Sequence, residues 1–228
     1  PSSAASDVYK RQEEYGIPKT NDFNTGDNFG VGFFQFTTSF NKVGLKLRCS
    51  AAKGYLNPAK KRSNLKIVTN AHVQKINFEG KKATGVNYFT GEKIITVNAN
   101  KEVILSASSI NSPKLLMLSG IGPAEHLKEN GIEVLADRPG VGKNLQDHLE
   151  LYIQMAANEP ISLYRYWNLL GKAYVGLRWM ISRTGPGASN QFESAAFIRT
   201  KAGVKYPDIQ YHFLPIAVRY DGKAAVNG

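Results

Sequence analysis

The chain has 228 residues, of which 42% are hydrophobic, and a formal net charge of +11. This composition can bury a core, which excludes overall disorder and suggests one large domain or parts of two. The single cysteine, Cys49, excludes an internal disulfide and a multi-cysteine metal site, and it fits a reducing compartment such as the cytoplasm. No apolar run reaches the roughly 18 residues that a membrane-spanning helix needs.

The positive charge lies in short clusters. Lys60-Lys61-Arg62 ends an expected helix and Lys81-Lys82 lies in an expected turn, where solvated side chains are the simpler interpretation. We therefore expect no nucleic-acid partner. The apolar segment 171–181 is too short to span a bilayer and carries Arg178, so we expect it to be a packed helix.

The first twelve residues do not resemble the sequence of a folded domain. Ser2 to Gln12 look like a translated sequencing adapter, so we set residues 1–12 aside as an artefact. Residues 13–42 are rich in glycine, asparagine and aromatic residues, which is typical of loops. Phe33, Phe34 and Phe36 form either a short edge strand or the lining of a substrate entrance. Apolar residues at helical spacing predict a helix over 46–61.

Four short β-type runs separated by turn residues follow. They are Leu65–Thr69, His72–Phe78, Ala83–Phe89 and Lys93–Asn98. Strands at this spacing predict a small antiparallel meander.

The segment from Val103 to Gly122 combines a strand, a corner and a helix. The apolar run 103–105 predicts a buried strand, and the small residues 106–109 let a ligand approach the backbone. Ser112 is a suitable N-cap, Pro113 suits the first helical position and Gly120 a left-handed C-cap. From the residues alone, this corner is either a site for a phosphate-bearing ligand or an ordinary βα turn.

The same segment resembles the second signature of the glucose-methanol-choline (GMC) oxidoreductases, a flavoprotein family. The matching residues are Ser108, Ser109, Ser112, Pro113, Leu115, Leu116, Ser119, Gly120, Ile121 and Gly122, and the stretch Pro139 to His148 is also similar. Members of the family usually carry glycine and alanine where this chain has Ser108 and Ser109. A positive φ at Ser108 would therefore be strained.

Beyond this corner, Pro123 begins an expected second helix that ends at Gly131, and 132–135 are expected to return as a strand. The segments 187–200 and 207–215 alternate like sheet strands.

The resemblance implies a mixed α/β (α+β) fold. It assigns residues 13–148 to part of an FAD-binding domain with an antiparallel β-excursion, and 149–228 to part of a sheet-based substrate domain. The chain would then be the middle of a longer family chain, because the N-terminal GxGxxG fingerprint of the family is absent. FAD is the implied cofactor. The implied contacts are the backbone of Val73 with the adenine, and Ser106, Ala107 and Ser108 at the corner.

The C-terminal part is similar to choline-oxidising members of the family. A quaternary ammonium needs a carboxylate and aromatic faces, and Glu193 matches the family's ammonium-binding glutamate. Tyr211 and Phe213 are candidate walls, with His212 on the opposite face of a regular strand. The alternative for Glu193 is a salt bridge with Arg199.

The implied activity is hydride transfer from an alcohol, choline first, to flavin, as in glycine betaine synthesis. We assign no catalytic residue, because the family's catalytic histidine is expected beyond Gly228; His72, His126, His148 and His212 lie outside that motif. We expect no metal, and the electron acceptor stays open. The resemblance also allows peripheral association with the inner face of the cell membrane. The alternatives are a GMC enzyme for a neutral alcohol and a non-catalytic basic binding module.

Overall fold

The computed structural model describes residues 10–40, 44, 46–156, 158–159, 161–189 and 191–219. The chain forms two compact units. The continuous unit is Arg62–Leu151, and the discontinuous unit joins Pro1–Lys61 with Tyr152–Gly228. This grouping differs from the division at residue 148 expected from the sequence, because an early strand pairs with a late one in the discontinuous unit.

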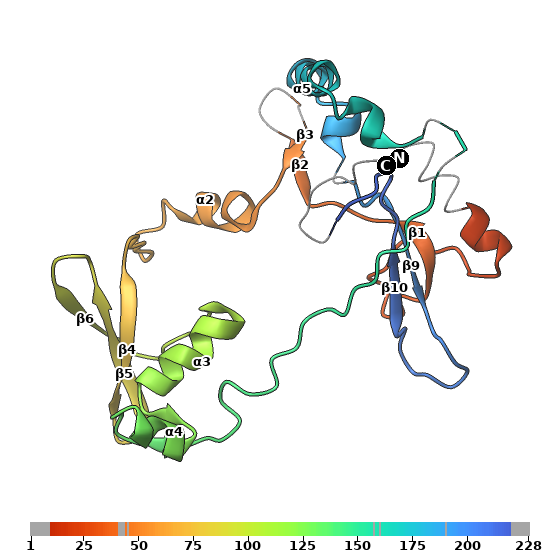
Figure 1. Ribbon diagram of the computed structural model, residues 1–228. Helices are drawn as coiled ribbons and strands as arrows, with labels where there is room; N and C mark the ends of the chain where they lie inside the picture. The colour runs from red at the N-terminus through yellow and green to blue at the C-terminus, as the bar shows by residue number, and fades with distance from the viewer. Residues whose placement is uncertain are drawn as a thin grey trace. The chain divides into compact units, whose positions relative to one another are not determined.

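The continuous unit is built on an antiparallel three-stranded sheet. Its strands are β4 (His72–Glu79), β5 (Lys82–Phe89) and β6 (Ile94–Asn98), in that order (Figure 1). The predicted meander is therefore confirmed, except that Leu65–Thr69 is not a strand. A strand exists only where a neighbour accepts its backbone hydrogen bonds, and no described strand pairs with residues 65–69.

Helix α3 (Ser108–Leu118) lies beside β4 in the same unit. Residues 103–105 precede it without regular secondary structure and pair with no described strand, so the predicted strand there is wrong. The helix also begins earlier than predicted, with Pro113 inside it. Ser112 is not the N-cap; instead its hydroxyl accepts a hydrogen bond from the Ala107 N–H (3.0 Å). Gly120 does follow the helix end with φ +86°, as expected of a left-handed cap.

A short βαβ segment completes the continuous unit. β7 (Ile121–Gly122) pairs in parallel with β8 (Ala136–Asp137), and α4 (Ala124–Glu129) lies between them in the chain. The helix starts after Pro123 and ends before Gly131 (φ +68°), as predicted. The returning strand lies at 136–137 rather than at 132–135, because only these residues pair with β7.

The discontinuous unit contains a second antiparallel sheet of order β1-β9-β10. These strands are β1 (Gly30–Phe33), β9 (Ser194–Ile198) and β10 (Ile209–His212). Val31 and Ala196 pair across β1 and β9, are fully buried, and form the core of this sheet. The two late segments with strand-like alternation therefore do form strands.

The remaining early elements differ from the helix predicted over 46–61. β2 (Thr38–Phe40) pairs with β3 (Lys46–Arg48), so the first residues of that range are a strand. Helical structure follows as η1 (Ala52–Leu56, a π-helix) and α2 (Asn57–Ala59). Apolar residues at helical spacing did not reveal the pairing with β2, because pairing is not local.

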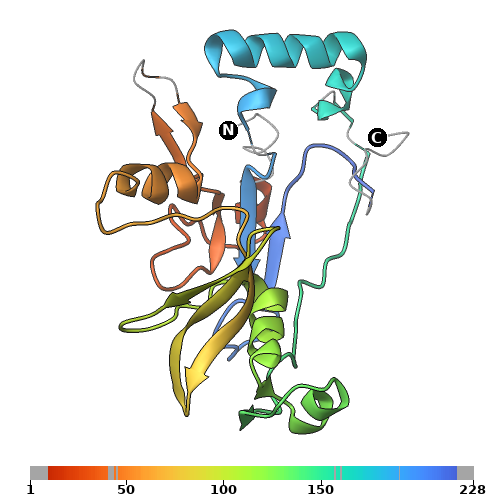
Figure 2. The ribbon, with the colours of Figure 1, turned by 90° about the vertical axis from the view of Figure 1, so that its left-hand side faces the viewer.

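Residues 163–188 of the discontinuous unit form three helical elements. A 3₁₀ turn, η2 (Leu163–Tyr166), leads into α5 (Leu169–Ser182), which is followed by a second 3₁₀ turn, η3 (Pro186–Ala188). Figures 1 and 2 show α5 at the margin of the unit. The helix predicted within residues 171–181 is confirmed, but the expectation that it packs into a core is wrong, since none of the residues of α5 is buried.

Candidate functional site: a hollow beside α3 and an aromatic cluster beside Glu193

A hollow of about 430 Å³ opens between the sheet and α3 of the continuous unit. The sheet contributes Val73, Ile76 and Val86, the helix contributes Leu115, and residues 103–107 form the remaining wall. Three predicted cofactor residues, Val73, Ser106 and Ala107, therefore line one hollow although they are far apart in the chain. Ser108, the fourth, begins α3 beside this wall and is not among the lining residues.

Two serine hydroxyls, one within α3 (Ser112) and one directly after it (Ser119), connect segments that wall the hollow. Ser119 is buried and accepts a hydrogen bond from the Ile76 N–H on β4 (2.9 Å), while Ser112 accepts one from the Ala107 N–H. The pairing of β4 with β5 also shifts register between Val73 and Lys75, which is a β-bulge or irregularity. Bulges often occur next to binding sites because they redirect the local backbone.

The lining suits a flat, uncharged ring better than a bare anion. No charged side chain lines the hollow, and its walls are valine, isoleucine, leucine, alanine and one serine. The small side chains of Ser106 and Ala107 leave the backbone open to close approach. The residues present therefore fit an aromatic ring such as that of a nucleotide, held by apolar walls and backbone groups.

Ser108 is strained as anticipated. Its φ is +77°, in the left-handed region that side-chain-bearing residues rarely adopt. Glycine would adopt this conformation without a steric penalty. The corner therefore keeps a glycine-type backbone although its residue is serine.

A second cluster of candidate residues surrounds Glu193 in the discontinuous unit. Glu193 lies directly before β9, and its carbonyl accepts a hydrogen bond from the Phe34 N–H (3.1 Å). The His212 ring contacts the rings of Phe34 and Phe192, each with centroids 5.4 Å apart. Phe23 extends the cluster through contacts with Phe34 (5.8 Å) and Phe197 (5.0 Å). The neighbourhood of Glu193 is thus aromatic.

Of the two residues predicted as aromatic walls, Tyr211 lies on the face of the sheet opposite His212. β10 is regular, so Tyr211 and His212 do point to opposite faces, paired with Ala196 and Ala195 respectively. The residue that contacts the rings beside Glu193 is His212, whereas Tyr211 is on the other face. Phe213 lies just past β10 and donates its N–H to the Ser194 carbonyl (3.1 Å).

Sequence reasoning missed Phe34, which contacts Glu193, and the rings of Phe23 and His212, which contact Phe34. Phe34 had been considered only as part of an edge strand or of a substrate entrance. The pairing of β1 with β9 brings it to Glu193, and no local pattern indicates such a pairing. For His212, the alternation along the strand is as expected, but the sequence-based prediction chose Tyr211 and Phe213 as the walls, whereas His212 is the residue that contacts Phe34 and Phe192.

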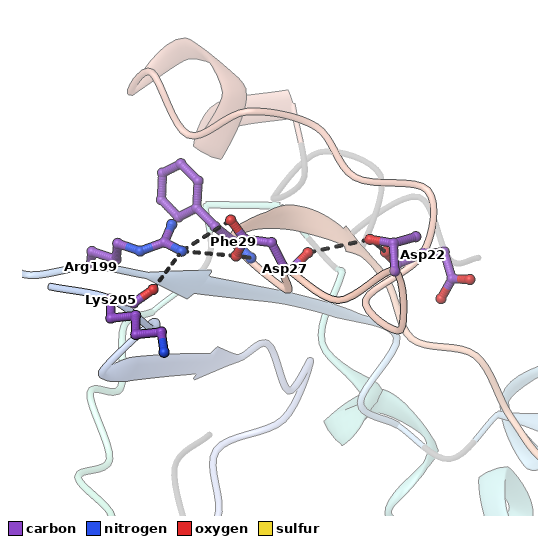
Figure 3. Close-up of polar contacts among 6 residues, drawn as sticks. Asp22, Asp27, Phe29, Arg199 and Lys205 are labelled. Carbon is purple, nitrogen blue, oxygen red and sulfur yellow. Dashed lines mark hydrogen bonds and ion pairs between the residues drawn. The ribbon is translucent and has the colours of Figure 1, made fainter.

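Arg199 does not serve as the salt-bridge partner that we considered for Glu193. Its guanidinium donates to both carboxylate oxygens of Asp27 (2.9 and 3.0 Å) and to the Lys205 carbonyl (3.2 Å), as Figure 3 shows. It also lies over the Phe29 ring. The Phe29 N–H and then Arg199 hold the pKa of Asp27 below its usual value. Hydrogen bonds from the Thr200 hydroxyl and N–H lower the pKa of Asp208.

Two types of site are not found among the residues that the structure describes. No three His, Cys, Asp or Glu side chains gather as a metal site would require. No helix in the same residues is both long and apolar enough to cross a bilayer.

Comparison with protein families identifies the chain. The profile described as GMC oxidoreductase matches residues 2–150. The chain belongs to the GMC oxidoreductase family. FAD is the cofactor bound by this N-terminal GMC domain, so the hollow beside α3 lies in an FAD-binding domain. The match also includes residues 2–12, whose origin as an adapter stays a prediction.

The curated GMC relatives include several choline dehydrogenases. The chain is 57% identical over 210 residues to the oxygen-dependent choline dehydrogenase of Brucella ovis, and 51% identical over 215 residues to that of Sinorhizobium fredii. These alignments cover 92% and 94% of this chain but only 37% and 38% of the relatives. The chain thus spans a little over a third of their length.

Solved GMC-type structures share the fold. The chain aligns with an FAD-dependent oxidoreductase from Chaetomium thermophilum at a TM-score of 0.72 and 28% identity, covering 86% of this chain and 34% of that one. Pyridoxine 4-oxidase from Mesorbium loti aligns at a TM-score of 0.72 and 26% identity, covering 99% and 40%. The mixed α/β fold with antiparallel sheets is therefore confirmed.

Proposed function

We propose that this chain is part of an FAD-dependent choline dehydrogenase that oxidises choline to betaine aldehyde, a step of glycine betaine synthesis. The observation that carries the substrate assignment is the aromatic cluster of Phe34, Phe192 and His212 next to Glu193. A carboxylate beside aromatic faces suits a quaternary ammonium, which donates no hydrogen bonds. The names of the Brucella and Sinorhizobium relatives support the same substrate.

For the cofactor, the proposal assigns Val73, Ser106, Ala107 and Ser108 to FAD. The walls of the hollow would hold an aromatic ring of the cofactor, and the open backbone at Ser106 and Ala107 would let it approach closely. FAD, when bound, supplies the two-electron acceptor for alcohol oxidation. The residues of this chain then exclude water from the ring and set its position.

For the substrate, the proposal assigns the positive charge of choline to Glu193. Tyr211 and Phe213 stay proposed substrate contacts, although Tyr211 lies on the face opposite His212. We assign no catalytic residue among the four histidines of the chain.

A small alcohol is the broader substrate class, and a GMC enzyme for a neutral alcohol is the nearest alternative. A non-catalytic basic module is the other alternative, favoured only by the net charge of +11. We further propose a cytoplasmic protein that associates peripherally with the inner face of the cell membrane.

The test uses the product of the complete gene, purified and assayed with an artificial electron acceptor. We expect a yellow protein that carries flavin and prefers choline to its uncharged carbon isostere, in which a tert-butyl group replaces the trimethylammonium. Equal activity on the two alcohols would refute choline as the substrate. A colourless, inactive protein would refute the flavin assignment itself.

A further inference from the structure

A row of ring contacts leads from the neighbourhood of Glu193 to Phe23. The Phe34 N–H donates to the Glu193 carbonyl (3.1 Å), and the centre of the Phe34 ring lies 5.4 Å from that of His212. On its other side, the Phe34 ring lies 5.8 Å from the Phe23 ring. The Phe23 ring also meets the Phe197 ring of β9 edge to face, with 5.0 Å between centres. Phe23 therefore supports the ring that is next to Glu193.

Phe23 comes from the loop of residues 18–29 that precedes β1, which we call the Phe23 loop. Its first part is bonded to β1, because the Thr20 N–H donates to the Val31 carbonyl (2.8 Å). A Cβ on Gly32 would collide with the Thr20 carbonyl and would lie 3.4 Å from the Phe23 ring. The loop thus lies directly against β1, and only a residue without a side chain leaves room for Phe23 there.

The other end of the Phe23 loop is held by Arg199, which is 172 residues away from Asp27 in the chain (Figure 3). The guanidinium donates to both carboxylate oxygens of Asp27 (2.9 and 3.0 Å) and to the Lys205 carbonyl (3.2 Å). Its central carbon lies 4.9 Å from the centre of the Phe29 ring. Arg199 directly follows β9, and Lys205 lies between β9 and β10, so one side chain ties the loop to this hairpin.

The pair of Asp27 and Arg199 is better suited to set a position than to strengthen the fold. Ion pairs with an exposed partner contribute little stability, and the Asp27 side chain is 61% exposed. The Arg199 side chain is only 23% exposed, and its planar guanidinium meets an acceptor in the loop, an acceptor in the hairpin and a ring face. These three contacts fix the orientation of the guanidinium, and with it the distance between loop and hairpin.

We infer that Asp27 and Arg199 are positioning residues for the site of the quaternary ammonium. By fixing the Phe23 loop, they keep the Phe23 ring against Phe34, and thereby Phe34 beside Glu193. The attraction between a cation and an aromatic ring requires close approach to the ring face, so a displaced Phe34 would lose part of it. The inference rests on the proposed function, because it needs a substrate with a quaternary ammonium.

The test uses the purified, flavin-containing product of the complete gene with an artificial electron acceptor. Asp27→Asn removes the ion pair, so we expect KM for choline to rise about threefold, as a weakened cation–π attraction implies. The kcat should stay unchanged, because the reacting hydroxyl group is not affected. Arg199→Lys keeps the charge but not the planar guanidinium, and it should raise KM in the same direction.

Asp208→Asn is the matched control. The Asp208 carboxylate accepts a hydrogen bond from the Thr200 N–H (2.8 Å), so it holds the same β9–β10 hairpin without reaching the Phe23 loop through this bond. The variant should leave KM for choline unchanged. An equal rise of KM in Asp208→Asn and Asp27→Asn would mean that any loosening of the hairpin disturbs the site, and it would overturn the inference.

A double-mutant cycle tests whether the ion pair acts through Phe23. Phe23→Leu alone should raise KM for choline about threefold. Adding Asp27→Asn to this variant should raise KM little further, because both changes displace the same ring. If the two rises multiplied instead, the ion pair would act independently of Phe23 and the inference would be wrong.

The wild-type enzyme tests the proposed function separately. Its preference for choline over the uncharged isostere is measured first, and the absence of that preference would overturn the proposed substrate together with the inference. If the preference is present and Asp27→Asn leaves KM for choline unchanged, only the inference fails. A lower kcat with unchanged KM would also overturn it. Flavin absorbance and thermal unfolding confirm that each variant is folded.

Discussion

The Ser119 hydroxyl joins α3 to the sheet through the backbone N–H of Ile76, with 2.9 Å between nitrogen and oxygen. The same hydroxyl donates to the Leu115 carbonyl within α3 (2.6 Å). Ser119, Ile76 and Leu115 are all buried, and the last two line the hollow. One side chain therefore sets the distance between two of its walls.

Replacing Ser119 should destabilise the continuous unit. Ser119→Ala leaves a buried N–H without a partner, so we expect the free energy of unfolding to fall by about 1–3 kcal/mol. Ser109→Ala, at an exposed position of the same helix, should be neutral or slightly stabilising. Urea unfolding of the two variants measures the difference. Equal stability of both would mean that the Ser119 bond contributes nothing.

Ser108→Gly should stabilise the corner. Glycine relieves the strain of φ +77°, and part of that gain is offset by the greater entropy of the unfolded chain, so we expect a net gain of about 0.5–1 kcal/mol. Ser109→Gly, one residue on in the regular helix, should instead lose about 0.5 kcal/mol. Thermal unfolding measures the difference. If Tm changed in the same direction in both variants, Ser108 would not be strained in the wild type.

Filling the hollow should weaken cofactor retention. Ala107→Leu introduces a larger side chain into the wall, so we expect the purified gene product to retain less FAD by absorbance than the wild type. Ser109→Leu, outside the lining, is the matched control and should retain FAD normally. Full FAD occupancy in Ala107→Leu would exclude this hollow as the cofactor site.

Glu193→Gln should discriminate between charged and neutral alcohols. Loss of the carboxylate removes an attraction to the trimethylammonium, so KM for choline should rise on the order of tenfold. The KM for the uncharged isostere should change little, and Glu92→Gln, in the exposed turn before β6, should change neither. A parallel rise for both alcohols would assign Glu193 a structural role instead.

The lowered pKa values of Asp27 and Asp208 predict a dependence of stability on acid. A carboxyl whose folded-state pKa lies below its ordinary value of 3.8 stabilises the fold above that value. This contribution disappears as the pH falls through the lowered pKa. Asp27→Asn and Asp208→Asn should therefore lower Tm at pH 6, and the difference from the wild type should shrink at low pH. If the Tm difference between the wild type and these variants grew as the pH fell, the two pKa values would not be lowered in the folded state.

Local chemistry was predictable from the sequence where it depends on neighbouring residues. Turn residues marked the meander, Pro123 and Gly131 bounded α4, and Gly120 closed α3. The start of α3 was not predictable from Ser112 and Pro113, because the Ser112 hydroxyl bonds back to Ala107 and the helix tolerates the proline inside it.

The sequence by itself determined the family, the antiparallel meander and the corner with its small residues, because each of these depends on residue types at short, regular spacing. Only the tertiary structure decided that Val73, Ser106 and Ala107 share one hollow, that Phe34 contacts both Glu193 and His212, and that no residue of α5 is buried. The physical reason is that strand pairing and burial join segments far apart in the chain, and local periodicity does not specify which face meets which partner.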